Sequence, residues 1–419
     1  VLPACGKMTV IELHNPNGFT LSLAGAHLTD DVLTPQKWTF PAGASIPPGG
    51  YLVVFASGKD RPGNGGARRP HTNFKLSLTG EYLGLFGPDS LREAASELAP
   101  EYPEQRHDIA YGLDPAGQWR YFPGGTPGVP NGLSPISQAV EPVHFSVPRG
   151  FFDRPFNLSL ATPTPGATIR YTLDGSLPSL TNGIAYLEPI PLSVTRMIRA
   201  SAFAANRLPS TVATHTYLFN LPVSRRRLPV LSLVTDKANL FGQTGIMESN
   251  PRNTTKHGLA WERPVSAELI RPEDNEGFQV DCGIRVQGGG YIRERYDYRS
   301  SDVNVNKYSF RLYFRGDYGP GRLEYPLFPG TTLESFDTVV LRAGMNDHTN
   351  PFLTDEFVRA LAADCGQPAA LGSFVHLFLN GVYKGYYNPC ERIDIDFLRA
   401  YHGGGEAWDV IAQFGEVRE

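Results

Sequence analysis

Short apolar segments separated by turns rich in glycine and proline run through the chain from one end to the other. The 419 residues include 44 glycines and 36 prolines, yet 41% of all residues are hydrophobic. Proline and glycine interrupt long helices and favour tight turns, whereas the apolar share is high enough to form cores. The sequence therefore predicts a folded, largely β protein, and its length allows two to four domains.

Charge and hydropathy exclude several broad classes of protein. The formal net charge is −4, so no overall positive field favours nucleic acid or an anionic membrane. No run approaches the ~20 consecutive apolar residues of a membrane-spanning helix. The first five residues show neither an initiator methionine nor the pattern of a signal peptide, and we therefore expect a processed or truncated chain.

The four cysteines are Cys5, Cys282, Cys365 and Cys390. They form no CxxC pair and have no metal-ligand spacing. The pattern favours free buried thiols, with one disulfide between Cys365 and Cys390 as the alternative.

Residues 1–132 contain a series of short strand-like segments. Residues 10–14 alternate in polarity, residues 51–55 are mostly apolar, and Gly, Pro and Asn turns lie between such segments. This spacing predicts a β-sandwich. The resemblance to bacterial lamin-tail domains, which implies an immunoglobulin-like sandwich, is carried by residues 11–18 (IELHNPNG), 38–43 (WTFPAG) and 126–131 (TPGVPN).

Three aromatic residues of this first module, Trp38, Trp119 and Tyr121, are candidates for contact with a glycan. Aromatic rings on a surface offer flat apolar faces, but the same residues more commonly pack in a core. The choice between these two places depends on the fold.

A second compact module is predicted over residues 142–219, after a linker rich in Pro, Gly and Ser. Residues 156–160 and 168–172 alternate in polarity, and Asp174-Gly-Ser176 has the composition of a tight turn. Residues 167–176 (ATIRYTLDGS) and 198–203 (IRASAF) resemble the small β-sandwich at the C-terminus of chitobiase-type enzymes, where it is an accessory module.

The pattern changes again over residues 226–419. Apolar strands are predicted at 230–234, 264–270, 310–314, 338–342 and 375–379. Residues 350–364 instead place Phe357, Val358 and Leu361 at helical spacing, after an acidic first turn. Strands mixed with an occasional helix predict an α+β domain.

This third region resembles the CotH family, atypical secreted protein kinases first known from bacterial spore coats. The resemblance is carried by residues 283–290 (GIRVQGGG), 306–319 (NKYSFRLYFRGDYG), 325–328 (YPLF), 374–387 (FVHLFLNGVYKGYY) and 391–398 (ERIDIDFL). It implies a protein-kinase-like fold that is incomplete at its C-terminus here. With the first two modules, the chain is predicted to contain two immunoglobulin-like sandwiches followed by this domain. The resemblance also implies ATP with Mg²⁺ or Mn²⁺ as the phosphoryl donor, and an extracytoplasmic protein as the acceptor.

Phosphoryl transfer needs groups that hold the triphosphate. Gly288, Gly289 and Gly290 follow a predicted strand, and their amides could turn towards phosphate oxygens, although a plain hairpin turn has the same composition. Lys307 precedes the next strand, where the family usually has two lysines, and Arg311 lies within that strand. A solvated lysine at a strand edge is the alternative for Lys307.

Glu391 begins a family pattern, Glu-x-x-Asp-x-x-Phe-Leu, that continues with Asp394. The resemblance implies that Glu391 pairs with the phosphate-binding lysine or holds a metal-bound water. Asp394 suits the start of a helix near Ile395, because a carboxylate there complements the helix dipole. Asp347 also matches a family position, and a turn is its alternative.

In CotH-like kinases the catalytic aspartates follow well after the Glu391 segment. We therefore expect no catalytic residue within the chain and an inactive fragment, and we assign no metal ligand. Asp409 and Glu416 are given no catalytic role. The three modules imply a secreted or cell-surface bacterial protein, whose sandwiches bind surface polysaccharide or act as spacers. The alternative is a non-catalytic surface or matrix protein that uses the CotH-like unit as a structural or binding domain.

Overall fold

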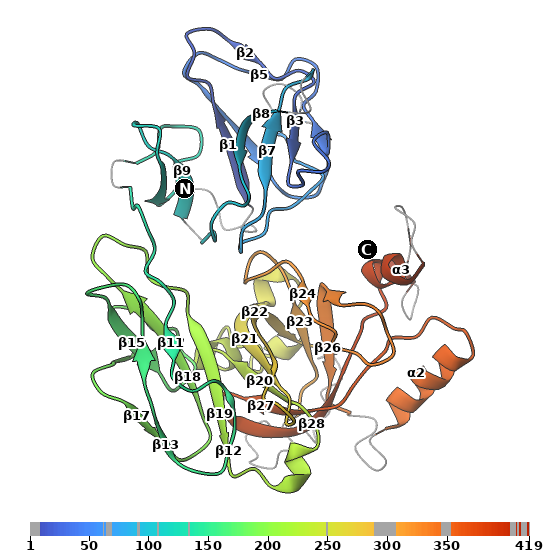
Figure 1. The fold of residues 1–419 in the computed structure, drawn as a ribbon. Helices are drawn as coiled ribbons and strands as arrows, with labels where there is room; N and C mark the ends of the chain where they lie inside the picture. The colour runs from blue at the N-terminus through green and yellow to red at the C-terminus, as the bar shows by residue number, and fades with distance from the viewer. Residues whose placement is uncertain are drawn as a thin grey trace. The chain divides into compact units, whose positions relative to one another are not determined.

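The computed structural model describes residues 9–418, except 62, 64–68, 90–92, 107–108, 133–134, 249, 289–306, 345–352, 403–407, 409 and 412–416. The chain forms two compact units, residues 1–139 and residues 140–419. Both are mostly β, and the described residues include only three α-helices (Figure 1). The predicted β-rich character is confirmed, whereas the two immunoglobulin-like sandwiches, the kinase-like α+β class and the three domain boundaries stay predictions.

The first unit consists of short antiparallel strands around an apolar core. Trp38, Phe40 and Val54 belong to this core, so Trp38 is a packing residue and is not available to a glycan. The pairs are β1 (Val10–His14) with β6 (Tyr51–Phe55), β2 (Leu21–Ser22) with β5 (Ser45–Ile46), β9 (Ile109–Leu113) with β10 (Trp119–Pro123), and a sheet in the order β4 (Trp38–Thr39), β3 (His27–Thr29), β7 (Leu83–Phe86), β8 (Ala94–Leu98).

The second unit begins with a module of small sheets over residues 140–219. Asp174 accepts hydrogen bonds from the backbone and hydroxyl of Ser176 at 3.0 and 2.6 Å, which confirms the predicted tight turn. The strands are β11 (His144–Phe145) with β14 (Leu160–Ala161), β13 (Phe156–Leu158) with β17 (Ile190–Leu192), and a sheet in the order β12 (Gly150–Phe152), β19 (Ala213–Phe219), β18 (Arg196–Phe203), β15 (Thr168–Thr172), β16 (Ile184–Ala185).

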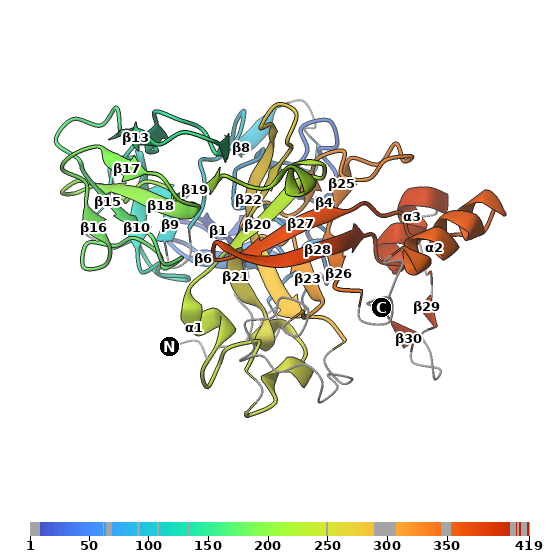
Figure 2. The same ribbon diagram turned by 90° about the horizontal axis from the view of Figure 1, so that it is seen from below.

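A closed barrel of seven strands forms the rest of the second unit. Its first strand pairs in parallel with the strand at residues 375–379, and this pairing closes the barrel. The strand at residues 382–390 curves across one side of the barrel in Figure 2. The predicted strand positions are confirmed. In barrel order the strands are β20 (Val230–Val234), β21 (Arg263–Ile270), β22 (Gly277–Val286), β23 (Phe310–Tyr313), β26 (Thr338–Arg342), β28 (Val382–Cys390) and β27 (Val375–Leu379).

Smaller elements lie outside the barrel. The two-residue strands β24 and β25 pair with one another, as do β29 and β30. These elements are β24 (Leu323–Glu324), β25 (Ser335–Phe336), β29 (Val410–Ile411), β30 (Val417–Arg418), α1 (Lys237–Leu240), α2 (Thr354–Asp364), α3 (Ile395–His402), and the 3₁₀ turns Val223–Arg226, Asn253–Thr255 and Leu259–Trp261.

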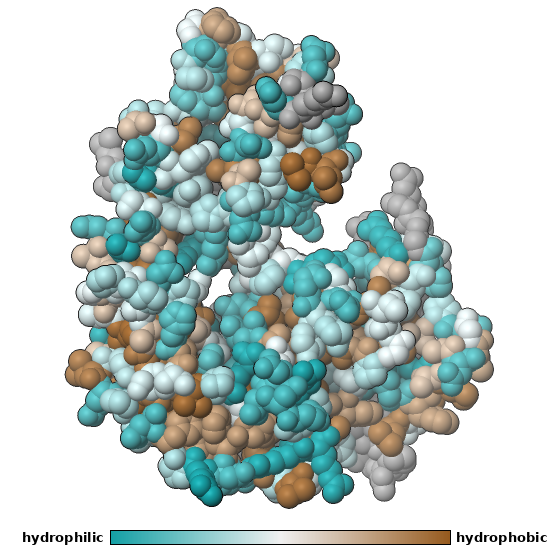
Figure 3. Space-filling view, viewed as in Figure 1, coloured by the Kyte–Doolittle hydropathy of each residue, from teal (hydrophilic) through white to brown (hydrophobic). Residues whose placement is uncertain are grey.

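The predicted helix is confirmed as α2, but its apolar stripe faces outward. Phe357, Val358 and Leu361 are 65, 55 and 51% exposed, and hydrophobic surface lies over α2 in Figure 3. The polar side faces the chain instead, because Arg359 and Glu356 both bond to Asn388, the latter at 2.7 Å. Ion pairs and hydrogen bonds, rather than apolar burial, therefore anchor α2.

Cys282, Cys365 and Cys390 are free thiols. The prediction of free cysteines is confirmed for these three, but Cys365 is exposed rather than buried. It directly follows the last residue of α2, a helix without a buried residue among those described. Cys5 lies outside the described residues.

A buried polar contact joins the module of residues 140–219 to the barrel. Glu268 of β21 is fully buried and accepts hydrogen bonds from the amide and the hydroxyl of Thr216 in β19, at 3.1 and 2.5 Å. The same hydroxyl lies 2.8 Å from the Ser232 hydroxyl of β20. An apolar cluster that includes Leu218 and Ile270 packs beside it. The two parts of the second unit therefore share one interface.

We expect Glu268→Gln to stabilise the chain at alkaline pH. Burial raises the pKa of Glu268 to about 7, so stability that is present below the ordinary pKa is lost as the pH rises through the raised value. Glutamine carries no charge, and its oxygen can still accept from the Thr216 amide while its NH₂ group donates to the Thr216 hydroxyl. The free energy of unfolding of Glu268→Gln, relative to that of the wild type, should increase by roughly 2–3 kcal/mol between pH 5 and pH 8, measured by urea unfolding.

The matched control is Glu273→Gln, which changes an exposed carboxylate in the connection between β21 and β22. It should shift stability equally at both pH values. A Glu268→Gln variant with the pH dependence of the wild type would contradict a neutral, buried Glu268.

Candidate functional site

A polar pocket of about 310 Å³ lies on the outer face of the barrel. Arg285 of β22 pairs directly with Arg311 of β23, while the alternate residues Ile284 and Leu312 enter the barrel core. Successive side chains of a strand point to opposite faces, so both arginines project away from the core. The residues that line the pocket are Gly258, Leu259, Glu262, Arg285, Arg311, Tyr313, Arg315, Asp337, Thr338, Arg392, Asp394, Ile395 and Asp396.

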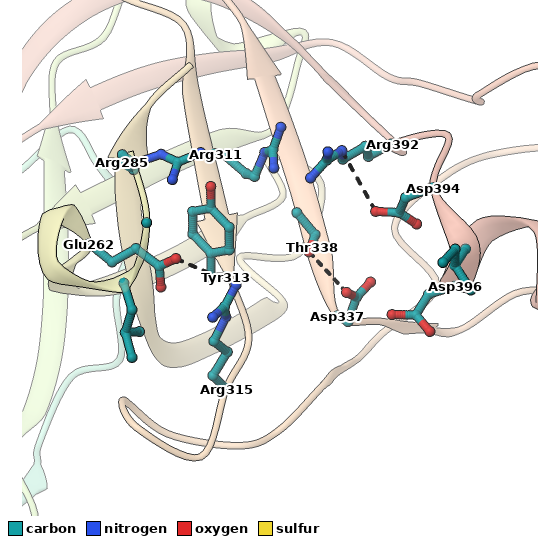
Figure 4. Close-up of a pocket in the computed structure, with 13 residues that line it drawn as sticks. Glu262, Arg285, Arg311, Tyr313, Arg315, Asp337, Thr338, Arg392, Asp394 and Asp396 are labelled. Atoms are coloured by element: carbon teal, nitrogen blue, oxygen red, sulfur yellow. Dashed lines mark hydrogen bonds and ion pairs between the residues drawn. The ribbon is translucent and has the colours of Figure 1, made fainter. Parts of the chain in front are cut away.

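Positive charge gathers on one side of this pocket. Figure 4 shows the guanidinium groups of Arg285, Arg311 and Arg392 in a row. The ring of Tyr313 lies below them, with its centroid 5.4 Å from the guanidinium carbon of Arg285 and 5.5 Å from that of Arg311. Cations over an aromatic face are attracted by its quadrupole, so Tyr313 helps to hold the two arginines.

Arg311 is the most deeply buried of these arginines, with 6% of its surface exposed. Burial lowers the pKa of its guanidinium to about 10. Within the described residues, neither its Nε atom nor that of Arg285 has a hydrogen-bond partner. The two arginines line the pocket, and guanidinium groups in such a place suit an anionic ligand.

Glu262 forms the other side of the arginine cluster. It is 5% exposed, and one of its oxygens lies 3.4 Å from the guanidinium of Arg315. Burial raises the pKa of Glu262, although Arg315 and Arg285 oppose the shift. Glu262 therefore compensates only part of the positive charge.

Three carboxylates, those of Asp337, Asp394 and Asp396, lie at the opposite end of the pocket (Figure 4). The Thr338 hydroxyl donates to Asp337 at 3.0 Å. Burial raises the pKa of Asp337, and the negative charges of Asp394 and Asp396 raise it further. The pocket is therefore bipolar, with arginines at one end and carboxyl groups at the other.

Asp394 has a structural role as well. Its carboxylate accepts a hydrogen bond from the Phe397 amide at 3.2 Å, at the start of α3. This contact confirms the predicted helix cap. The Nε of Arg392 lies 3.7 Å from the other oxygen of Asp394, which ties the basic and acidic ends together.

The acidic end does not form a metal site as it stands. Among the described residues, no group of three His, Cys, Asp or Glu side chains could hold a metal ion. The described helices also include none that is long and apolar enough to cross a membrane.

Lys307 does not line this pocket. Its ammonium donates to the Tyr386 carbonyl at 2.8 Å and lies 4.9 Å from the centroid of the Tyr387 ring. Burial lowers its pKa to about 8. Lys307 is therefore half-buried and bound to backbone outside the pocket, and its role in nucleotide binding stays a prediction.

Glu391 is buried and engaged in local contacts. One oxygen accepts from the Leu371 amide at 2.8 Å, and the other accepts from the Tyr401 hydroxyl at 2.9 Å. Burial raises the pKa of its carboxyl. These bonds join the segment before β27 to α3. Glu391 therefore helps to anchor α3, whose first turn carries the acidic end of the pocket.

The glycine prediction is only partly covered by the structure. Gly288 has a positive φ of 69°, as a turn after β22 requires. Gly289, Gly290, Asp347, Asp409 and Glu416 lie outside the described residues.

Sequence reasoning found Arg311 but missed Arg285, Arg392 and Asp337. Arg285 could have been found from alternation, because it stands two residues before Gln287 in a predicted strand and has the outward phase. Arg392 and Asp337 carry no such signal, since the fold brings them together from segments more than fifty residues apart.

Comparison with known families supports part of the predicted resemblance. Residues 284–412 match the family model described as CotH kinase protein, and residues 158–217 match the model described as Fn3 associated. No curated protein matches the sequence. The fold and the site define a mostly β, multidomain protein with a bipolar pocket. Within it, residues 284–412 carry a CotH kinase-family domain. The lamin-tail and chitobiase-type resemblances stay predictions.

We expect Asp337→Asn to stabilise the chain at neutral pH. The raised pKa of Asp337 means that stability falls as the pH rises through it, because ionisation is disfavoured beside Asp394 and Asp396. Asparagine retains an acceptor for Thr338. The gain should be about 1 kcal/mol at pH 7 and smaller at pH 4, measured by chemical unfolding. Glu334→Gln, at an exposed acid, is the control. Loss of stability in Asp337→Asn at pH 7 would mean that the arginines outweigh the acids.

Proposed function

We propose that the chain is part of a CotH-like protein kinase and that its pocket binds the phosphates of ATP. The observation that carries the proposal is the buried Arg311, which lines a pocket beside Arg285 and Arg392. Guanidinium groups bind phosphate through paired, charge-assisted hydrogen bonds. The match to a CotH kinase model over the same strands supports a phosphoryl donor rather than another anion.

The phosphates occupy the arginine end in this proposal. Arg285 and Arg311 bind phosphate oxygens from the floor of the pocket, and Arg392 binds them from the side of α3. In the parent protein, the hydroxyl oxygen of a Ser or Thr acceptor forms a bond to the γ-phosphorus. The bond to the β-phosphate oxygen breaks, and the hydroxyl proton passes to a base. No described residue is assigned as that base.

The nucleotide arrives as its Mg²⁺ or Mn²⁺ complex in this proposal. Among the described residues, no group of three metal-ligating side chains is found, and we assign the acidic end a task that requires none. Asp394 and Asp396 repel a second anion and thereby confine the phosphates to the arginine end.

A secreted or cell-surface location and an extracytoplasmic protein acceptor belong to the same proposal. They are supported by the CotH match alone. The modules before the CotH domain would then hold the parent at a surface, by contact with polysaccharide or as spacers.

The second candidate function is a non-catalytic surface or matrix protein. The position of Lys307 favours it, because its ammonium is bound to the Tyr386 carbonyl and does not line the pocket. In such a protein the pocket would bind an anion without transferring a phosphoryl group.

Binding of a non-hydrolysable ATP analogue with Mn²⁺ should depend on Arg311. We expect saturable binding by isothermal titration calorimetry, and about 10- to 100-fold weaker binding for Arg311→Met because a charge-assisted contact is lost. Methionine fills most of the volume without burying a charge, so the fold should be retained.

The matched control is Arg271→Met, because Arg271 is exposed and paired with Asp274 at 2.8 Å. It should bind the analogue as the wild type does. Absence of saturable binding, or equal binding by Arg311→Met, would refute the pocket as the phosphate site. Transfer of ³²P from labelled ATP to a protein, by the full gene product, separates the kinase from the non-catalytic alternative.

A further inference from the structure

The hairpin of β9 and β10 carries three aromatic rings on one face. The register pairs Tyr121 with Tyr111 and Trp119 with Leu113. Residues directly opposite one another point to the same side of an antiparallel pair, so Tyr111, Trp119 and Tyr121 share that side. Sequence reasoning named Trp119 and Tyr121, and the fold adds Tyr111.

The rings form a short contiguous surface. Tyr111 and Trp119 have nearly parallel planes, 15° apart, with centroids at 5.4 Å, and Tyr111 and Tyr121 have centroids at 4.9 Å. All three side chains are partly exposed. Leu113, on the same face, is 48% exposed. This contrasts with Trp38, which is 3% exposed in the core of the same unit.

The hairpin is held in place independently of any ligand. Asp114 accepts hydrogen bonds from the amides of Ala116 and Gln118, both at 2.9 Å, and thereby closes the turn. The backbone of Tyr121 pairs with Ile136. A ligand would therefore meet rings that are already positioned, which lowers the entropic cost of binding.

Charge on and around this face is balanced. The residues of the aromatic face are uncharged, and the nearest charges are paired, Arg120 with Asp114 at 3.7 Å and Arg106 with Glu104 at 3.9 Å. Among the described residues around this face, both arginines are paired with carboxylates, so an anionic polymer is not favoured. A ligand with apolar faces and neutral hydroxyl groups matches the surface better.

We propose that Tyr111, Trp119 and Tyr121 bind the pyranose rings of a neutral polysaccharide. One face of a pyranose ring consists of C–H groups, which pack on an aromatic face where the electron density is high. The ring hydroxyls remain at the edge, where the Tyr111 and Tyr121 hydroxyl groups and water can bond them. This inference goes beyond phosphate binding and does not depend on it.

The test is native affinity electrophoresis of the chain in gels that contain hydroxyethyl cellulose, galactomannan or laminarin. At least one of these neutral polymers should retard the wild type, and Trp119→Leu should bind about 10-fold more weakly, as expected for an aromatic anchor. Trp119→Tyr, which keeps a ring, should restore most of the binding. Trp261→Leu, in the other unit, is the matched control and should bind as the wild type does.

Tyr121→Leu provides a second variant if Trp119→Leu does not fold, which thermal unfolding shows. The proposal is overturned if none of the three polymers retards the wild type, or if the folded aromatic variants are retarded equally. Stronger retardation by dextran sulfate than by the neutral polymers would overturn the proposal and indicate electrostatic binding of an anionic polymer. Self-association that Trp119→Leu abolishes, measured by sedimentation, would overturn it in favour of a second copy on this face.

Discussion

The antiparallel register between β22 and β23 determines where the charge of the second unit lies. It sets Arg285 against Arg311 and sends Ile284, Phe310 and Leu312 into the barrel. Two like charges directly opposite one another are unfavourable, and burial of Arg311 adds a desolvation cost. Burial of the apolar side chains of β22 and β23 offsets this cost. If either strand slipped by one residue, its apolar side chains would turn out of the core. The strand register therefore keeps Arg285 and Arg311 side by side despite their mutual repulsion.

The same barrel makes one compact unit of two regions that match different family models. The Fn3 associated match covers residues 158–217, and the CotH match begins at residue 284. Between them, Thr216 supplies hydrogen bonds to the fully buried Glu268 of β21. Gly175 adds a close approach, since a Cβ atom there would collide with the Thr235 carbonyl. The first region therefore packs directly against the barrel and is not a freely tethered module.

Local features of the fold could be predicted from the sequence, and long-range ones could not. The strands at 230–234 and 338–342 were predicted correctly, because an apolar run of five residues between turns has few alternatives. The Asp394 cap was predicted for a similar reason, since its partner amide is three residues away. The pocket depends instead on Asp337 meeting Asp396, and no periodicity relates such distant positions. The outward stripe of α2 was not evident either, because its spacing is the same as that of a buried helix.

Lys307 and Arg311 belong to the same segment but contact different parts of the structure. They are four residues apart, which is about 13 Å along an extended strand. Arg311 reaches the pocket, whereas Lys307 reaches the Tyr386 carbonyl and the Tyr387 ring. A lysine that binds phosphate in this fold would have to leave both partners. Arg311 already lines the pocket and needs no such rearrangement, so it is the better primary contact for a phosphate.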